Sequence, residues 1–122
     1  MVSLPAGLEL ELALNDRIGP EPAVGDLFTA TVTRPSMNRA ITVPAGGRVT
    51  GRLTRMQHSK DGTRNLWSIG LTLLRVEWPG NIAKVSARLR RAQGMKPPRD
   101  TIWVVGRDPV LPAGLPMTWR VE

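Results

Sequence analysis

Hydrophobic residues alternate with polar or small residues in several short runs of this chain. Leucine occupies every second position of residues 8–14, and Met, Trp and Val do the same in residues 117–121. A period of two is typical of a β-strand with one buried face. No stretch keeps the 3.6-residue period of an amphipathic helix for more than one or two turns. The pattern predicts an all-β protein.

Turn residues separate the predicted strands, each of which shows alternation or an enrichment in β-branched residues. Residues 91–100 are the one stretch that we expect to form a mobile loop. The predicted strands are residues 7–14, 27–34, 40–44, 47–56, 65–77, 82–90, 101–105 and 116–121.

The tripeptide Pro-Ala-Gly occurs three times, each time after an aliphatic residue and before an alternating run. Proline fixes φ near −65° and glycine tolerates positive φ, so the pattern predicts a tight turn that leads into a strand. If the copies are equivalent, their glycines adopt a positive φ. The residues that define these turns are Pro5 and Gly7, Pro44 and Gly46, and Pro112 and Gly114.

Two further turn signals and one change of phase indicate how the strands connect. Asp61-Gly62 and Pro79-Gly80-Asn81 are hairpin signals. In the strand between them the inward parity changes at Leu73-Leu74, as a β-bulge would produce. Bulges are common where a sheet curls into a barrel. We therefore expect residues 1–122 to form one domain, a closed or partly open antiparallel barrel of about seven or eight strands.

The alternation also predicts the core, because one parity of each strand must face inward. It places Phe28 and three of the four tryptophans inward, and Trp103 lies in an apolar run. With the aromatic rings in the core, a protein that stacks nucleic-acid bases is not expected. The predicted core comprises Leu10, Leu12, Phe28, Val32, Val49, Leu53, Trp67, Leu71, Val76, Val85, Leu89 and Trp119.

The net charge of +7 is unevenly distributed: residues 1–33 carry −4, residues 34–107 carry +12 and residues 108–122 carry −1. A basic middle segment favours anionic partners such as nucleic acid or an acidic surface, although net charge also serves solubility. Outward positions of two strands form basic rows, which make a phosphate-binding patch if the strands are neighbours. These cations can equally pair with Glu9, Glu11 and Glu77. The candidate polyanion-binding residues are Arg48, Arg52, Lys84, Arg88 and Arg90.

The chain lacks the residues of most catalytic sites. It has no cysteine, and His58, beside a predicted turn, is the one histidine. No His/Cys cluster or calcium-loop spacing predicts a metal site, and the glycine pair Gly46-Gly47 opens a strand rather than a phosphate-binding helix. We expect a non-enzymatic protein with no cofactor. No run is apolar enough to predict a membrane span.

The turn motifs, in their order, resemble a known group of proteins. Residues 4–8, 24–32 and 43–51 contain a Pro-Ala-Gly turn, a Gly-Asp-x-Phe strand start and a second Pro-Ala-Gly turn. This arrangement resembles uncharacterised bacterial envelope proteins and the C-terminal β-barrel domain of the scaffold subunit of type IV secretion and conjugation channels. The inner-membrane helix, proline-rich linker and helical insertion of that subunit have no counterpart here.

The resemblance implies a periplasmic or envelope-associated scaffold that interacts with other envelope proteins or with itself. It also implies a signal sequence, which we expect to have been removed because a turn motif begins three residues after Met1. The alternative function is a basic module that binds nucleic acid or another acidic surface.

Overall fold

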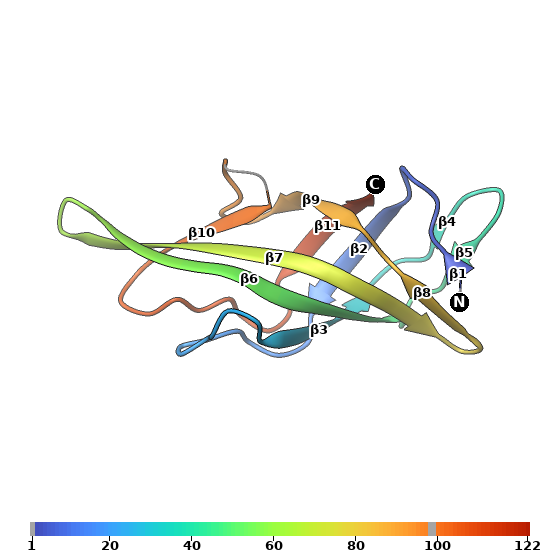
Figure 1. Cartoon of the computed structure of the whole chain (residues 1–122), viewed down its shortest axis with the longest axis horizontal. Helices are drawn as coiled ribbons and strands as arrows, with labels where there is room; N and C mark the ends of the chain where they lie inside the picture. The colour runs from blue at the N-terminus through green and yellow to red at the C-terminus, as the bar shows by residue number, and fades with distance from the viewer. Residues whose placement is uncertain (1, 98–99) are drawn as a thin grey trace.

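The computed structural model describes residues 2–97 and 100–122, which contain strands and no helix (Figure 1). The all-β prediction is confirmed. Residues 98–99 of the predicted mobile loop lie outside the described residues. The strands are β1 (Val2–Ser3), β2 (Glu9–Leu14), β3 (Leu27–Val32), β4 (Ser36–Met37), β5 (Thr42–Val43), β6 (Arg48–Asp61), β7 (Arg64–Trp78), β8 (Asn81–Lys84), β9 (Ala87–Ala92), β10 (Thr101–Val105) and β11 (Pro116–Val121).

Nine of these strands form one curled, barrel-like sheet. Its order is β1-β8-β7-β6-β3-β2-β11-β9, with β10 paired to the first half of β7, and only the β1–β8 pair is parallel. Only two residues separate β8 from β9. Val85 donates to Leu74 of β7, and Ser86 accepts from Glu122 beyond β11. This segment therefore passes from one end of the strand order to the other, which brings the ends of the curled sheet together.

The three Pro-Ala-Gly turns are equivalent, as predicted. Gly7, Gly46 and Gly114 have φ of 90°, 89° and 82°. In each turn the proline carbonyl accepts a hydrogen bond from the residue after the glycine, and the glycine N–H donates to a neighbouring strand or its continuation. Positive φ at the third residue of a four-residue turn is the type II geometry, which favours glycine. Each turn thus starts a strand in register with its neighbour.

The predicted bulge is also present. Thr50 pairs with Arg75 and Gly51 pairs with Leu73, so Leu74 is the extra residue. A second shift leaves Thr54 of β6 without an opposite residue, and a third lies between Thr118 and Trp119 of β11. Bulges increase the local twist and bend a strand, which helps this sheet to curl.

The core lies inside the curled sheet, with Trp119 fully buried at its centre. Eleven of the twelve predicted core residues are buried. The exception is Trp67, which is half-buried. Trp78 and Trp103 are also half-buried, so the expectation that the aromatic rings fill the core holds for Phe28 and Trp119 only.

The β6–β7 hairpin is longer than predicted. We expected strands over 47–56 and 65–77, whereas pairing continues to Asp61 and Arg64. Figure 1 shows the closed end of this hairpin extending beyond the other strands. Trp67 lies on this extension, where the strand parity still points inward but less of the barrel covers the side chain. The strand predicted over 82–90 is interrupted at Val85-Ser86, and β1 and β4 were not predicted.

Candidate interaction surfaces

Strand order separates the five predicted basic residues into two groups, although all five side chains are exposed. Arg48 and Arg52 lie on β6, and Lys84 lies on β8. Both strands pair with β7, where Arg75 stands opposite Thr50 and Lys84. These cations share the outer face of β6–β7–β8. We expected the basic rows of residues 47–56 and 82–90 to form one patch if their strands were neighbours. Strand β7 lies between β6 and β8, so these two strands do not pair with each other.

The second group lies on β9, next to β11. Arg88 pairs directly with Arg120, and Arg90 is the extra residue at the bulge. With Gly7, Met95 and Glu122 these arginines line an open hollow of about 560 Å³. Like charges directly opposite each other on a sheet destabilise it unless an anion screens them. The prediction missed Arg120, although its outward parity in residues 116–121 was readable.

The acidic residues that we considered as partners bond to other arginines. Glu11 forms an ion pair with Arg34 at 3.3 Å, and Glu77 forms one with Arg75 at 2.8 Å. Glu9 stands opposite Arg120 in the β2–β11 register. The Arg75–Glu77 pair places a carboxylate among the cations of the outer face. Both groups are therefore mixed in charge, because Glu9 and Glu122 lie beside the three arginines of β9 and β11 that line the hollow.

The projecting hairpin carries a small set of ordered polar contacts. The His58 ring stacks on Trp67 with centroids 4.3 Å apart, and its Nε2 lies 2.8 Å from Asn65 Oδ1. Trp67 Nε1 donates to the Gly106 carbonyl. At the hairpin end, Arg64 Nη2 donates to Asp61 Oδ2 at 2.6 Å. His58 therefore belongs to strand β6 and stacks on Trp67, whereas we expected a histidine beside the hairpin turn.

One edge of β6 is uncovered along this hairpin. Strand β3 pairs with β6 only from Arg48 to Arg52, and Leu53 exchanges bonds with Asp26 and Gly25. Farther along, the strand pairing in the described residues involves β7 alone. The opposite side of the hairpin differs, because β10 pairs with β7 from Leu66 to Gly70. The hairpin thus has one covered edge and one open edge.

The residues that face the open edge follow from the hairpin register. Asp61 and Arg64 flank a two-residue loop and form the first pair, which in such hairpins is hydrogen-bonded. Hydrogen-bonded and non-hydrogen-bonded pairs then alternate. Met56, His58 and Lys60 are therefore the residues whose N–H and C=O groups point away from β7. No sequence pattern predicted this edge, because the polar run 57–61 lacks apolar alternation.

The described residues contain no group of three or more His, Asp or Glu side chains placed to hold a metal ion. They also contain no helix that is long and apolar enough to cross a membrane.

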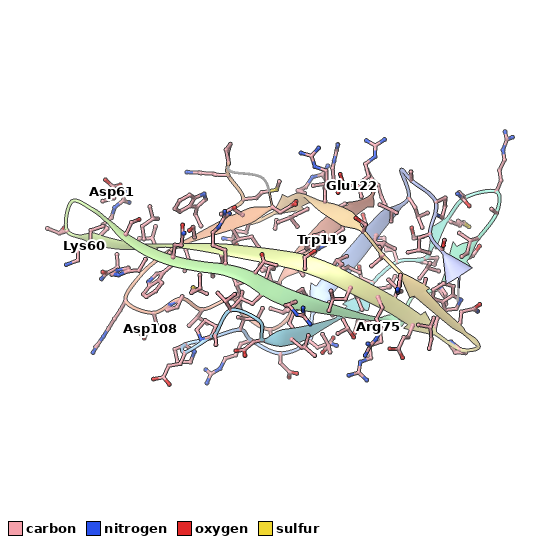
Figure 2. The ribbon with its side chains drawn as sticks, viewed as in Figure 1. Lys60, Asp61, Arg75, Asp108, Trp119 and Glu122 are labelled. Atoms are coloured by element: carbon pink, nitrogen blue, oxygen red, sulfur yellow. The ribbon has the colours of Figure 1, made fainter. Side chains whose placement is uncertain are left out.

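Figure 2 shows side chains such as Lys60 and Asp61 at the hairpin end, and Trp119 within the barrel. The two candidate interaction surfaces are the open edge of β6 and the arginines of β9 and β11. Comparison of the chain with models of protein families, with curated proteins and with solved structures finds no match.

Proposed function

We propose that this protein is a non-enzymatic protein-interaction module of the bacterial envelope that assembles through its β6–β7 hairpin. The observation that carries the proposal is the open edge of β6 on a hairpin that extends beyond the barrel (Figure 1). An exposed edge strand presents unpaired backbone donors and acceptors, which another extended chain can satisfy. The resemblance of the turn motifs to envelope scaffold domains supports the periplasmic or envelope location.

The side chains around the edge agree with a polar, reversible contact. Gln57, His58, Ser59 and Lys60 are exposed and none is a large aliphatic residue. Interfaces built on backbone hydrogen bonds depend on strand alignment more than on apolar area. A rigid hairpin also limits the conformational entropy lost on binding. The stacked His58–Trp67 pair supplies part of that rigidity.

Site-specific photo-crosslinking tests this function in the cells that produce the protein. A photo-reactive phenylalanine analogue replaces Lys60 on the open edge, and a matched control carries it at Met37, which is 69% exposed on β4, at the end of the molecule opposite the hairpin loop (Figure 1). We expect irradiation to give a protein adduct from position 60 and none from position 37. No adduct from position 60, with the protein folded and present, contradicts the proposal.

The β9–β11 arginines support a second candidate function, weak binding of a polyanion such as nucleic acid. The direct Arg88–Arg120 pairing is the observation that favours it, because a bound phosphate relieves the repulsion between the two guanidinium groups. Arg90 lines the same hollow. The sequence also predicted a polyanion as partner. Of the five residues predicted to bind it, only Arg88 and Arg90 line this hollow.

Two charge-matched variants test this candidate. Arg88→Glu with Arg90→Glu changes the β9–β11 group, whereas Arg48→Glu with Arg52→Glu changes net charge equally on the other face. We expect the first variant to bind duplex DNA more weakly and to flatten the plot of log affinity against log salt by roughly 0.9 per lost phosphate contact. Equal weakening by both variants attributes the binding to net charge. No binding by the parent at low salt excludes this function.

A further inference from the structure

We infer that the open edge of β6 pairs with the same edge of a second copy of this chain, antiparallel and with the two-fold axis at His58. The inference rests on the proposed function and names its partner. The result is a symmetric dimer in which the β6–β7 hairpins of two barrels form one continuous sheet. Two-fold contacts of this kind require a surface that is complementary to itself.

The backbone of the open edge meets that requirement. The N–H and C=O groups of Met56, His58 and Lys60 point away from β7. Antiparallel pairing about His58 places His58 opposite itself and Met56 opposite Lys60. In every such pair both residues direct their backbone groups toward the other copy, so each pair exchanges two backbone hydrogen bonds. The interface then contains about six such bonds. A register shifted by one residue places these residues opposite residues whose N–H and C=O groups already bond β7, so the hydrogen bonds are lost.

The side chains select this register among the remaining ones. With His58 on the axis, Arg55 stands opposite Asp61 of the second copy, and this ion pair occurs twice. Gln57 stands opposite Ser59, which is a polar match. Opposite residues of an antiparallel pair lie on the same face of the sheet, and non-hydrogen-bonded pairs such as these have the closer side chains.

Neighbouring registers lack this complementarity. If Gln57 lies on the axis, Arg55 faces Ser59. If Ser59 lies on the axis, Asp61 faces Gln57. In both arrangements the Arg55 and Asp61 charges have no opposite partner. If Lys60 lies on the axis, two lysines face each other, which is repulsive. The register centred on His58 alone pairs both charges.

Of the contacts already present at the two charged residues, that of Asp61 is compatible with the dimer and that of Arg55 has to change. Asp61 accepts from Arg64 through Oδ2, and a carboxylate has further acceptor positions. Arg55 donates through Nη2 to Thr101 Oγ1 of β10, across β7 from the open edge, so the dimer requires this side chain to leave Thr101 and turn toward Asp61 of the second copy. The bulge at Thr54 ends the straight part of the edge, so the paired segment is Arg55–Asp61. A second copy therefore fits between the bulge and the hairpin turn.

Single-cysteine variants test the register, because the natural chain contains no cysteine. On its own, His58→Cys is expected to form a disulfide dimer under mild oxidation. Gln57→Cys and Ser59→Cys are each expected to form no disulfide alone and to form a mixed disulfide when combined. Paired positions of an antiparallel sheet lie within the Cα separation that a disulfide spans. Met37→Cys on β4 is the exposed control and is expected to remain unlinked.

Charge exchange tests the same dimer without a covalent bond. Asp61→Arg is expected to weaken dimerisation by roughly tenfold in sedimentation velocity, because two attractive pairs become repulsive. Arg55→Asp is expected to do the same. An equimolar mixture of the two variants restores both ion pairs in a heterodimer, so we expect the dimer to return. Circular dichroism establishes that each variant is folded.

A parent protein that stays monomeric up to about 1 mM, the range of the weakest specific complexes, overturns the inference. So does disulfide formation by Gln57→Cys alone that exceeds that of His58→Cys. An adduct of position 60 with a different protein, such as an acidic extended segment, also overturns the inference and leaves the proposed function intact. No adduct at position 60 contradicts the proposed function itself, so the two failures are distinguishable.

Discussion

At the scale of single residues, glycines of this fold are required for two different physical reasons. Gly46 has a φ of 89° with open space where a side chain would stand. Gly51 has an ordinary φ, but a Cβ there would lie 2.2 Å from Phe28 Cζ and 2.6 Å from the Thr72 carbonyl oxygen. The first position constrains the backbone and the second constrains packing between β3, β6 and β7.

The Gly46→Ala variant should lose about 1 kcal/mol of unfolding free energy, because alanine is strained at positive φ and meets no atom within 4 Å. Urea denaturation of the parent and the variant measures the difference. The control is Ala45→Ser in the same turn, which adds a side-chain atom at an exposed residue without a positive φ. A Gly46→Ala variant as stable as the parent contradicts the type II turn.

The Gly51→Ala variant should be more damaging, with a loss of about 3 kcal/mol, the upper range for overpacking. The Phe28 ring is 7% exposed and is held by neighbouring core residues, while the Thr72 oxygen belongs to the backbone. Denaturation beside Gly46→Ala ranks the two effects. A smaller loss for Gly51→Ala than for Gly46→Ala would show that Phe28 moves freely.

At the scale of elements, strands with clear alternation were predictable and the hairpin extension was not. The leucines of β2 and the Met-Trp-Val pattern of β11 identify those strands because each has one buried face. Beyond Met56, residues of β6 are exposed on both faces and carry no alternation. Their strand conformation comes from pairing with β7, which a period-two pattern does not encode. Trp67 was assigned to the core from its strand parity, which does not show that the strand continues beyond the barrel at that position.

Hairpin shortening separates the extension from the barrel. Replacing residues 60–65 with Asn-Gly joins Ser59 to Leu66, a hydrogen-bonded pair of the hairpin, through a two-residue turn of the type that hairpins favour. Most of the removed side chains are exposed, so we expect the unfolding free energy to change by about 1 kcal/mol or less. Thermal unfolding measures this, and loss of the folded state would show that the extension supports the barrel. The shortened protein should also fail to dimerise.

At the scale of the whole molecule, the candidate surface depends on strand order, which alternation does not reveal. Parity correctly predicted that Arg48, Lys84 and Arg88 are exposed. Whether they form one patch depends on which strands are neighbours. Strand β7 separates the β6 and β8 cations, and β9 lies beside β11 instead. The sequence thus identified the cations but not their grouping, nor the contribution of Arg120.

The barrel also depends on pairing between strands that are distant in sequence. Strand β11 lies between β2 and β9, and it supplies Met117, Trp119 and Val121 to the core. Removal of residues 116–122 exposes this core and leaves two edges open. We expect that truncated chain to lack the dispersed methyl signals of a folded protein in NMR spectra. Removal of Glu122 alone is the control and should preserve them.

The pairing of β2 with β11 has a consequence for the order of events during synthesis. Gly7 donates to the Val121 carbonyl and Val121 donates to Leu8, so the beginning and end of the barrel are bonded to each other. A ribosome releases β2 long before β11 is made, and the central tryptophan arrives last. The nascent chain therefore stays incompletely folded until translation has passed β11.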